Sequence, residues 1–124
     1  MFDTQRKLIV VDDDDSFLKI VCHKLKNSHW TVRTFTNGKG VIEDLDGADC
    51  IVIDYRLNQE NGIELATKIR QTAAADKLPI IIMSAAELSN EDRQEQESLC
   101  LKFIKKEVAL SNDFSEILDT CCRI

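Results

Sequence analysis

Polar residues that could bind a metal ion or neutralise charge end four of the apolar runs in this sequence. The first run ends in four consecutive aspartates, Asp12–Asp15, and a later run ends in Asp54. Two further runs end in Ser84 and in the pair Lys105 and Lys106. Clustered carboxylates repel one another unless a cation neutralises them. Mg²⁺ suits such a group because it prefers oxygen ligands and needs few of them from the protein.

Each of these acids also has an ordinary structural explanation. An Asp or Ser after a strand often caps the next helix, and a run of aspartates is commonly a solvated turn. We assign Asp14 and Asp15 to such capping or surface roles. Asp12 and Asp13 differ because they directly follow a fully apolar run, and Asp54 has no helix to cap for several residues. These three carboxylates are therefore the candidate metal ligands.

The elements that must position these residues alternate between two patterns. Short, β-branched apolar runs at Leu8–Val11, Cys50–Ile53 and Ile80–Met83 are typical of strands buried on both faces. Trp30–Phe35 alternates apolar with polar residues, as an edge strand does, and Leu101–Ile104 is a fifth candidate strand. The sequence also predicts five helices, in the segments that contain Phe17 to Leu25, Val41 to Leu45, Ile63 to Ile69, Ser89 to Leu99 and Leu110 to Cys121.

Five strands that alternate with five helices over short connections predict an α/β fold with a doubly wound parallel sheet. No repeat or low-complexity segment interrupts the pattern, so residues 1–124 are expected to form a single domain. In an open α/β sheet, ligands bind outside the carboxyl ends of the strands. The three carboxylates, Ser84 and Lys106 all follow strand ends, and they are therefore predicted to share one edge of the sheet.

The overall charge and the apolar pattern exclude several classes of partner. The formal net charge of −6 disfavours direct binding to nucleic acid or to an anionic membrane, both of which attract clustered Lys and Arg. No apolar stretch approaches the roughly 20 residues that a membrane-spanning helix needs, and the N-terminal residues lack the apolar core of a signal peptide. We therefore expect a cytoplasmic location with proteins as partners.

The sequence holds five cysteines, an odd number without a Cys-x-x-Cys spacing. We interpret them as small buried or half-buried apolar residues in a reducing compartment. A redox or metal-binding role for the adjacent Cys121 and Cys122 is the alternative. With two histidines and no His/Cys pair at the spacing of zinc ligands, a zinc site is not expected.

Four separated blocks of the sequence resemble the receiver domains of bacterial two-component response regulators, in the same order and spacing. The blocks are Leu8–Asp15, Asp49–Gly62, Pro79–Ala86 and Phe103–Lys106. The resemblance covers nearly the whole chain. It implies a flavodoxin-like receiver fold, related to the chemotaxis regulators, with the strand order 2-1-3-4-5.

The resemblance also implies a role for the acids at the predicted edge. Asp54 corresponds to the phosphoacceptor, and the donor in the family is a phosphohistidine on a sensor histidine kinase or a histidine phosphotransfer protein. Asp12 and Asp13 correspond to the acidic pair that binds Mg²⁺ together with Asp54 and the backbone carbonyl of Arg56. Because phosphoryl transfer passes through an anionic transition state, positioning and charge neutralisation supply most of the catalysis. The chain would thus catalyse its own phosphorylation and dephosphorylation without being a conventional enzyme.

Three further residues correspond to neutralising and switching positions of the family. Lys106 is expected to neutralise the phosphoryl oxygens, and Ser84 to donate a hydrogen bond to one of them. In the family, this Ser/Thr moves toward the phosphoryl group while an aromatic residue on the last strand turns inward. Phe103 matches that aromatic position, although a buried structural Phe looks the same in a sequence. The fourth helix, fifth strand and fifth helix would then be read by a downstream protein, a fused output domain or, in a phosphorylation-dependent dimer, a second copy.

The sequence departs from the family pattern next to Lys106. Glu107 replaces the proline that usually follows the lysine and whose peptide bond is commonly cis. A cis bond before another residue costs about 2.5–4 kcal/mol, so we expect either a trans bond with a shifted Lys106 or a strained cis bond. Lys105 is then a second candidate for the phosphate contact. Leu99 and Cys100 replace the Gly-Ala that often precedes the last strand.

Three other classes of protein share parts of this pattern. A pseudo-receiver would keep the fold as an interaction module that does not depend on phosphorylation, but the complete set of site residues argues against it. A flavodoxin-like cofactor binder would need a Gly/Ser/Thr loop after the first strand to hold a phosphate, and four aspartates there would repel it. A metal-dependent phosphohydrolase would need a pocket for an external substrate, which the sequence does not indicate.

Overall fold

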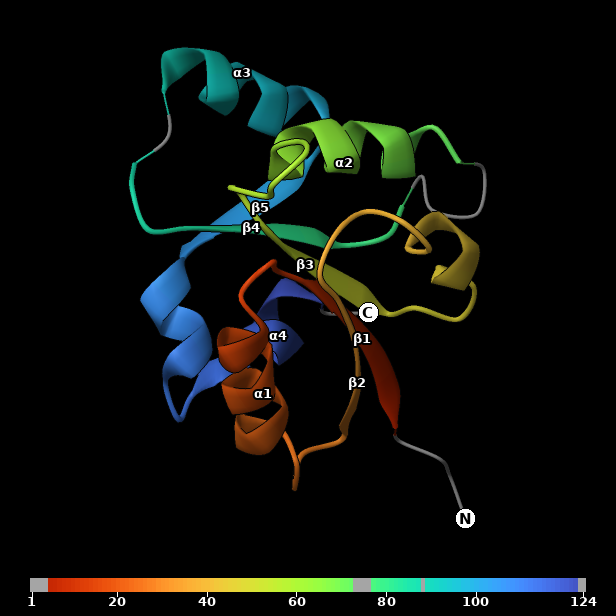
Figure 1. Cartoon of the computed structure of the whole chain (residues 1–124), viewed down its shortest axis with the longest axis vertical. Helices are drawn as coiled ribbons and strands as arrows, with labels where there is room; N and C mark the ends of the chain where they lie inside the picture. The colour runs from red at the N-terminus through yellow and green to blue at the C-terminus, as the bar shows by residue number, and fades with distance from the viewer. Residues whose placement is uncertain (1–4, 73–76, 88, 123–124) are drawn as a thin grey trace.

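The computed structural model describes residues 5–72, 77–87 and 89–122, and both ends of the predicted domain lie outside these ranges. The described residues form a five-stranded sheet in the order β2-β1-β3-β4-β5, in which every pairing is parallel (Figure 1). The predicted α/β fold, its strand order and the edge position of β2 are confirmed. The strands are β1 (Arg6–Val11), β2 (Trp30–Phe35), β3 (Cys50–Asp54), β4 (Ile80–Ser84) and β5 (Leu101–Lys105).

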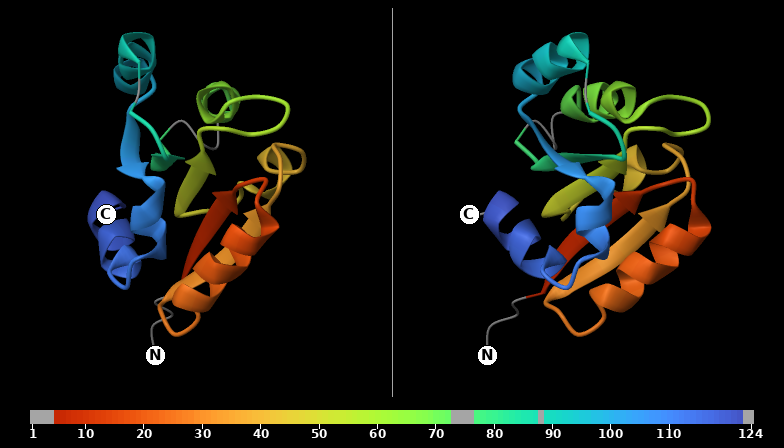
Figure 2. Two further views of the ribbon diagram at one scale, coloured as in Figure 1. Left: turned by 60° about the vertical axis from the view of Figure 1, so that its left-hand side comes forward. Right: turned by 90° about the vertical axis from the view of Figure 1, so that its left-hand side faces the viewer.

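Helices cover both faces of the sheet (Figure 2). In the part of the chain that the structure describes, none of them is long and apolar enough to cross a membrane. One face carries α1 (Asp15–Lys24), α4 (Phe114–Cys121) and the 3-10 segment η3 (Lys106–Leu110), and the other carries α2 (Gly62–Arg70), α3 (Asn90–Ser98) and the 3-10 turn η1 (Ile42–Asp44).

The apolar core has two layers because successive side chains of a strand point to opposite faces. Leu8 and Val10 of β1 pack with residues of α1 and α4, whereas Ile9 and Val11 pack with residues of α2 and with Val41 beside η1. Every residue of β3 and of β4 is buried. This explains why these two strands read as continuous apolar runs rather than as an alternation.

The predicted helix around Val41–Leu45 is a single 3-10 turn, so the described residues contain four α-helices rather than five. Gly40 and Gly47 have positive φ angles, of 81° and 77°, which helical backbone does not adopt. The segment between these glycines has room for little more than one turn. The polar helix predicted at Ser89–Leu99 is confirmed as α3, and it buries none of its side chains.

Side-chain caps fix the starts of the two helices that follow the polar edge. Asp14 accepts a hydrogen bond from the backbone N–H of Phe17 at 3.2 Å, so the predicted capping role is confirmed for this aspartate. Asn61 and Glu64 form a reciprocal capping box at the start of α2. Both helices therefore begin at defined residues next to the carboxyl ends of β1 and β3.

The five cysteines all carry free thiols. Cys50 and Cys122 are buried, and Cys22 and Cys121 are half-buried, as predicted. The prediction was wrong for Cys100, which is exposed because it lies just beyond the end of α3.

Candidate functional site

Three aspartates converge at the carboxyl edge of the sheet. Asp12 and Asp13 follow the last residue of β1, and Asp54 is the last residue of the neighbouring strand β3. One carboxylate oxygen of each aspartate lies within 4.8 Å of the other two. Asp12 is fully buried and Asp54 is 6% exposed, so two of the three charges are held away from solvent. Acids that are far apart in the sequence meet here because parallel strands bring their carboxyl ends to one edge.

The Lys106 ammonium reaches this cluster from the end of β5. Its Nζ lies 2.8 Å from Asp12 Oδ2 and 3.2 Å from Asp54 Oδ2. Burial lowers the pKa of Lys106, but the hydrogen bonds and charges of the two carboxylates outweigh burial and leave this pKa above its usual value. Lys106 therefore stays protonated and offsets one of the three negative charges.

The three carboxylates of this cluster carry more negative charge than the single Lys106 ammonium can neutralise. Burial and the nearby Asp12 carboxylate raise the pKa of Asp54 above its usual value, and the Lys106 ammonium offsets only part of this effect. Asp12 Oδ2 is buried, and within the described residues it makes no hydrogen bond of good geometry beyond its ion pair with Lys106. Three carboxylates that share one ammonium fit a hard divalent cation such as Mg²⁺.

A cavity of about 430 Å³ opens beside these side chains. The cavity is lined by Asp54 and Lys106, by Ser84, which is the last residue of β4, and by Arg56, which follows β3. Ser84 Oγ donates a hydrogen bond to the Ala86 carbonyl oxygen at 2.8 Å and accepts one from the Ala86 N–H at 3.1 Å. The Ser84 hydroxyl is thus held in its own turn, and it must exchange these bonds before it can bind a group in the cavity.

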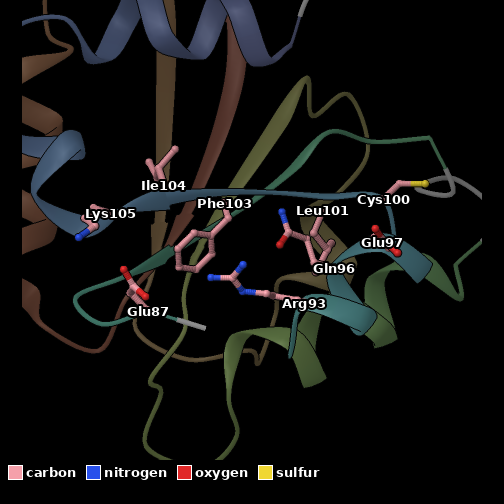
Figure 3. A pocket seen from close by; sticks show the side chains of 9 residues that line it. All are labelled: Glu87, Arg93, Gln96, Glu97, Cys100, Leu101, Phe103, Ile104 and Lys105. Carbon is pink, nitrogen blue, oxygen red and sulfur yellow. The ribbon is translucent and has the colours of Figure 1, made fainter. Parts of the chain in front are cut away.

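Phe103 and Lys105 line a different cavity, of about 610 Å³, on the side of β5 next to α3 (Figure 3). The Phe103 ring lies beside Arg93 and Gln96 of α3, and Ile104 points to the other face of the strand. Phe103 is half-buried and Lys105 is exposed. Of the two adjacent lysines, Lys105 faces away from the carboxylate cluster.

The peptide bond between Lys106 and Glu107 is trans, as are the other peptide bonds of the described residues. Of the two alternatives that the missing proline left open, the trans bond is therefore the one observed. Lys106 opens η3 directly after β5, and its ammonium still reaches both buried carboxylates. The replacement of proline by Glu107 does not remove the lysine from the cluster.

The sequence predicts neither of two further contacts at this edge. The ring centroid of Phe17 lies 4.7 Å from Lys106 Nζ. The Tyr55 hydroxyl donates a hydrogen bond to Asp92 Oδ2 of α3 at 2.8 Å. Phe17 has the spacing of an ordinary apolar helix residue, and Tyr55 simply follows a strand. No local pattern indicates either contact, because the partners come from distant parts of the chain.

The fold and the acidic edge define a class of signalling domain, and comparisons with known proteins agree with it. Residues 8–117 match the family model of the response regulator receiver domain. The chain is 31% identical over 107 residues to the two-component response regulator ARR21 of Arabidopsis thaliana. That match covers 82% of this chain and 16% of ARR21.

Two solved structures superpose on nearly the whole fold. The chemotaxis protein CheY4 of Vibrio cholerae matches with a TM-score of 0.78 and 22% identity, over 94% of this chain and 96% of that one. The receiver domain of the histidine kinase CKI1 from Arabidopsis thaliana, complexed with Mg²⁺ and BeF3⁻, matches with a TM-score of 0.75 and 21% identity. That match covers 94% of this chain and 89% of the CKI1 domain.

This chain therefore belongs to the response regulator receiver domain family, as the match to the family model shows. Because it spans 16% of ARR21, what that whole protein does is not carried over by the match.

Proposed function

We propose that this chain, as a single receiver domain, accepts a phosphoryl group on Asp54 and thereby switches a protein-binding surface. One observation carries the proposal. The Asp54 carboxylate lies beside two further aspartates, 3.2 Å from an ammonium, and it lines a cavity of about 430 Å³. Family membership supports the same reaction. A phosphorylation-independent pseudo-receiver would not need this set of charges to be complete.

The donor in this proposal is a phosphohistidine on a sensor histidine kinase or on a histidine phosphotransfer protein. A carboxylate oxygen of Asp54 attacks phosphorus, the P–N bond to the imidazole breaks, and the imidazole keeps the electron pair and takes up a proton. The product is an acyl phosphate on Asp54. Attack of water on phosphorus later returns the carboxylate and inorganic phosphate. Because such partners are intracellular signalling proteins, we propose a cytoplasmic location.

Lys106 and Ser84 would act on the phosphoryl oxygens. The Lys106 ammonium, 3.2 Å from Asp54 Oδ2, can neutralise the charge that spreads over these oxygens in the transition state. Ser84 would give up its hydrogen bonds to Ala86 and donate to a phosphoryl oxygen instead. Phe103 would then move within the neighbouring cavity of about 610 Å³ and change the surface of α3, β5 and α4. A downstream protein, an output domain or a second copy in a dimer would read this change.

We propose Mg²⁺ as the cofactor, held by Asp12, Asp13, Asp54 and the backbone carbonyl of Arg56. Bound there, it supplies positive charge to the carboxylates and to the phosphoryl oxygens. The buried Asp12 oxygen that lacks a hydrogen bond supports such a ligand. The CKI1 receiver domain, which shares this fold, was solved in complex with Mg²⁺ and BeF3⁻, and this supports the choice of ion.

Acetyl phosphate tests the proposal without a cognate kinase. We expect the wild-type chain to gain one phosphoryl group, seen by intact mass, in the presence of Mg²⁺ and not after its removal by a chelator. Asp54→Asn should abolish the gain, whereas Asp15→Asn, at an exposed position in the same edge, should not. If Asp54→Asn accepts phosphate at the wild-type rate, the acceptor is another residue. If the wild type stays unmodified and Mg²⁺ leaves its amide NMR spectrum unchanged, the chain is a pseudo-receiver.

A further inference from the structure

Besides its two ion pairs, Lys106 lies close to the aromatic ring of Phe17. Its Nζ lies 4.7 Å from the ring centroid, a distance at which the negative face of an aromatic ring attracts a cation. The Lys106 side chain is 24% exposed, so solvent only partly screens this attraction. Lys106 is therefore held by two carboxylates and by one ring.

The Phe17 ring is held in place mainly by apolar packing. Phe17 lies in the first turn of α1, where Asp14 fixes its backbone N–H through the helix cap. Phe17 is 6% exposed, and it packs in the core layer with Leu18 and Val21 of the same helix. A change in the charge of the nearby acids leaves these apolar contacts in place.

The backbone of Lys106 lacks the rigid following proline, and its side chain has four flexible methylenes. Glu107 follows through a trans bond, and η3 begins at Lys106 itself. In the proposed reaction both ionic partners of Lys106 also change. Asp54 would become an acyl phosphate, and Asp12 would coordinate the proposed Mg²⁺. The Phe17 ring is the partner that stays the same throughout.

We infer that Phe17 is a positioning residue for Lys106. The ring would keep the Lys106 ammonium at the edge of the sheet while Asp54 is phosphorylated and Asp12 binds the metal ion. The ammonium would then be in place to bind the incoming phosphoryl oxygens. The inference rests on the proposed function for its effect on rate, but the contact itself can be tested without phosphorylation.

The contact is tested by NMR of the metal-free protein. An aromatic ring shifts the ε-methylene protons of Lys106 upfield when the side chain lies over its face. We expect this shift in the wild type and in Phe17→Tyr, which keeps the ring, and its loss in Phe17→Leu, which keeps an apolar side chain. A wild-type Lys106 with the chemical shifts of an exposed lysine would overturn the inference.

The rate of phosphorylation by acetyl phosphate tests the consequence. Phe17→Leu should lower this rate about 3- to 10-fold and leave Mg²⁺ affinity unchanged, and Phe17→Tyr should restore the rate. Val21→Ala is the matched control, because it truncates another buried side chain one turn further along the same helix. It should destabilise the fold and leave the rate of the folded protein unchanged.

A double-mutant comparison separates positioning from a general effect on the fold. In a Lys106→Met background, Phe17→Leu should cause no further loss of rate, because there is no ammonium left to position. An equal loss in both backgrounds overturns the inference and makes Phe17 a core residue only. An unchanged rate in Phe17→Leu also overturns it, with the proposed function intact. A wild type that takes up no phosphate overturns the proposed function itself.

Discussion

The two sides of the carboxyl edge of the sheet are built differently. Asp12 follows the end of β1 and Asp54 is the last residue of the neighbouring strand β3, which is buried along its whole length. On the other side, β5 is an edge strand of which only Leu101 is buried, and α3 buries none of its side chains. The candidate carboxylates lie on the well-packed side, and the proposed readout surface lies on the weakly packed one.

This difference explains how one modification could change a surface without disturbing the core. Elements with few buried apolar contacts open or shift at low free-energy cost, whereas a central buried strand moves only when the core is disrupted. A new charge at Asp54 would therefore be accommodated by movement of α3 and β5 rather than by movement of β1 and β3.

The largest effect is expected from Gly62→Ala, which tests the well-packed side. A Cβ at Gly62 would lie 2.6 Å from the Asp54 backbone oxygen and 3.2 Å from Ile53 Cγ2, so the backbone that carries Asp54 must shift. We expect a loss of about 1–3 kcal/mol in the free energy of unfolding, measured with urea, and slower phosphorylation. Gly38→Ala is the control, since its Cβ would meet side-chain atoms and no backbone, the nearest being Leu65 Cδ1 at 3.1 Å. Equal stability of the two variants would contradict the conclusion that the backbone around Asp54 is tightly packed.

The next effect concerns the charge of Asp54 in the metal-free protein. Because its pKa is raised in the folded state, the folded protein binds a proton here more readily than the unfolded chain does. The ionised carboxylate therefore lowers stability above the folded-state pKa, and this loss disappears as the pH falls below the unfolded value of about 3.9. Asp54→Asn should raise the free energy of unfolding at pH 7 by on the order of 1 kcal/mol.

The measurement is urea unfolding of both proteins with a chelator present, at pH 7 and at the lowest pH where both remain folded. The gain in the free energy of unfolding that Asp54→Asn causes should become smaller as the pH is lowered. A gain that is independent of pH would mean that the asparagine acts through packing and not through the lost charge. Asp15→Asn, at the exposed start of α1, should show no such gain.

On the weakly packed side, Cys100 has a φ angle of 55°, and among the non-glycine residues that the structure describes it is the one with positive φ. It follows the C-cap of α3, where glycine is common because a left-handed residue with a Cβ is strained by roughly 1–2 kcal/mol. Cys100→Gly should therefore raise the free energy of unfolding by about 0.5–1 kcal/mol, since the flexibility of glycine in the unfolded chain offsets part of the relief. Cys100→Ala removes the thiol but keeps the Cβ, and it should leave stability unchanged in the same urea titration.

The sequence predicts the strands and the residues at their ends better than it predicts turns and contacts between elements, for a physical reason. Buried parallel strands require continuous apolar runs, and their ends share one edge, so the meeting of Asp12, Asp54 and Lys106 follows from the positions of the runs alone. The turn at η1 was predicted wrongly because apolar spacing cannot reveal that two flanking glycines take positive φ. The contacts of Phe17 and Tyr55 depend on packing between distant elements, which no local pattern encodes. The roles of Ser84 and Phe103 in switching stay predictions.

An effect smaller than that of Gly62→Ala is expected at a contact between the two sides. Tyr55 follows Asp54 directly, and its hydroxyl donates to Asp92 Oδ2 in the first turn of α3 at 2.8 Å. Because α3 buries no side chain, this hydrogen bond is one of few restraints on its position. Tyr55→Phe should lower the free energy of unfolding by about 0.5–1.5 kcal/mol and speed hydrogen exchange in α3, with little change in β1 and β3.

The same hydrogen bond raises the pKa of Tyr55, with smaller contributions from burial and from the charge of Asp92. Tyr55 is the one tyrosine of the sequence, so its ionisation can be followed by absorbance without interference from another phenol. Asp92→Ala should therefore lower the pKa of Tyr55 toward its ordinary value and speed hydrogen exchange in α3 as Tyr55→Phe does. Faster exchange in Asp92→Ala without a change in the Tyr55 pKa would show that Asp92 holds the helix through its own first turn and not through its hydrogen bond to Tyr55.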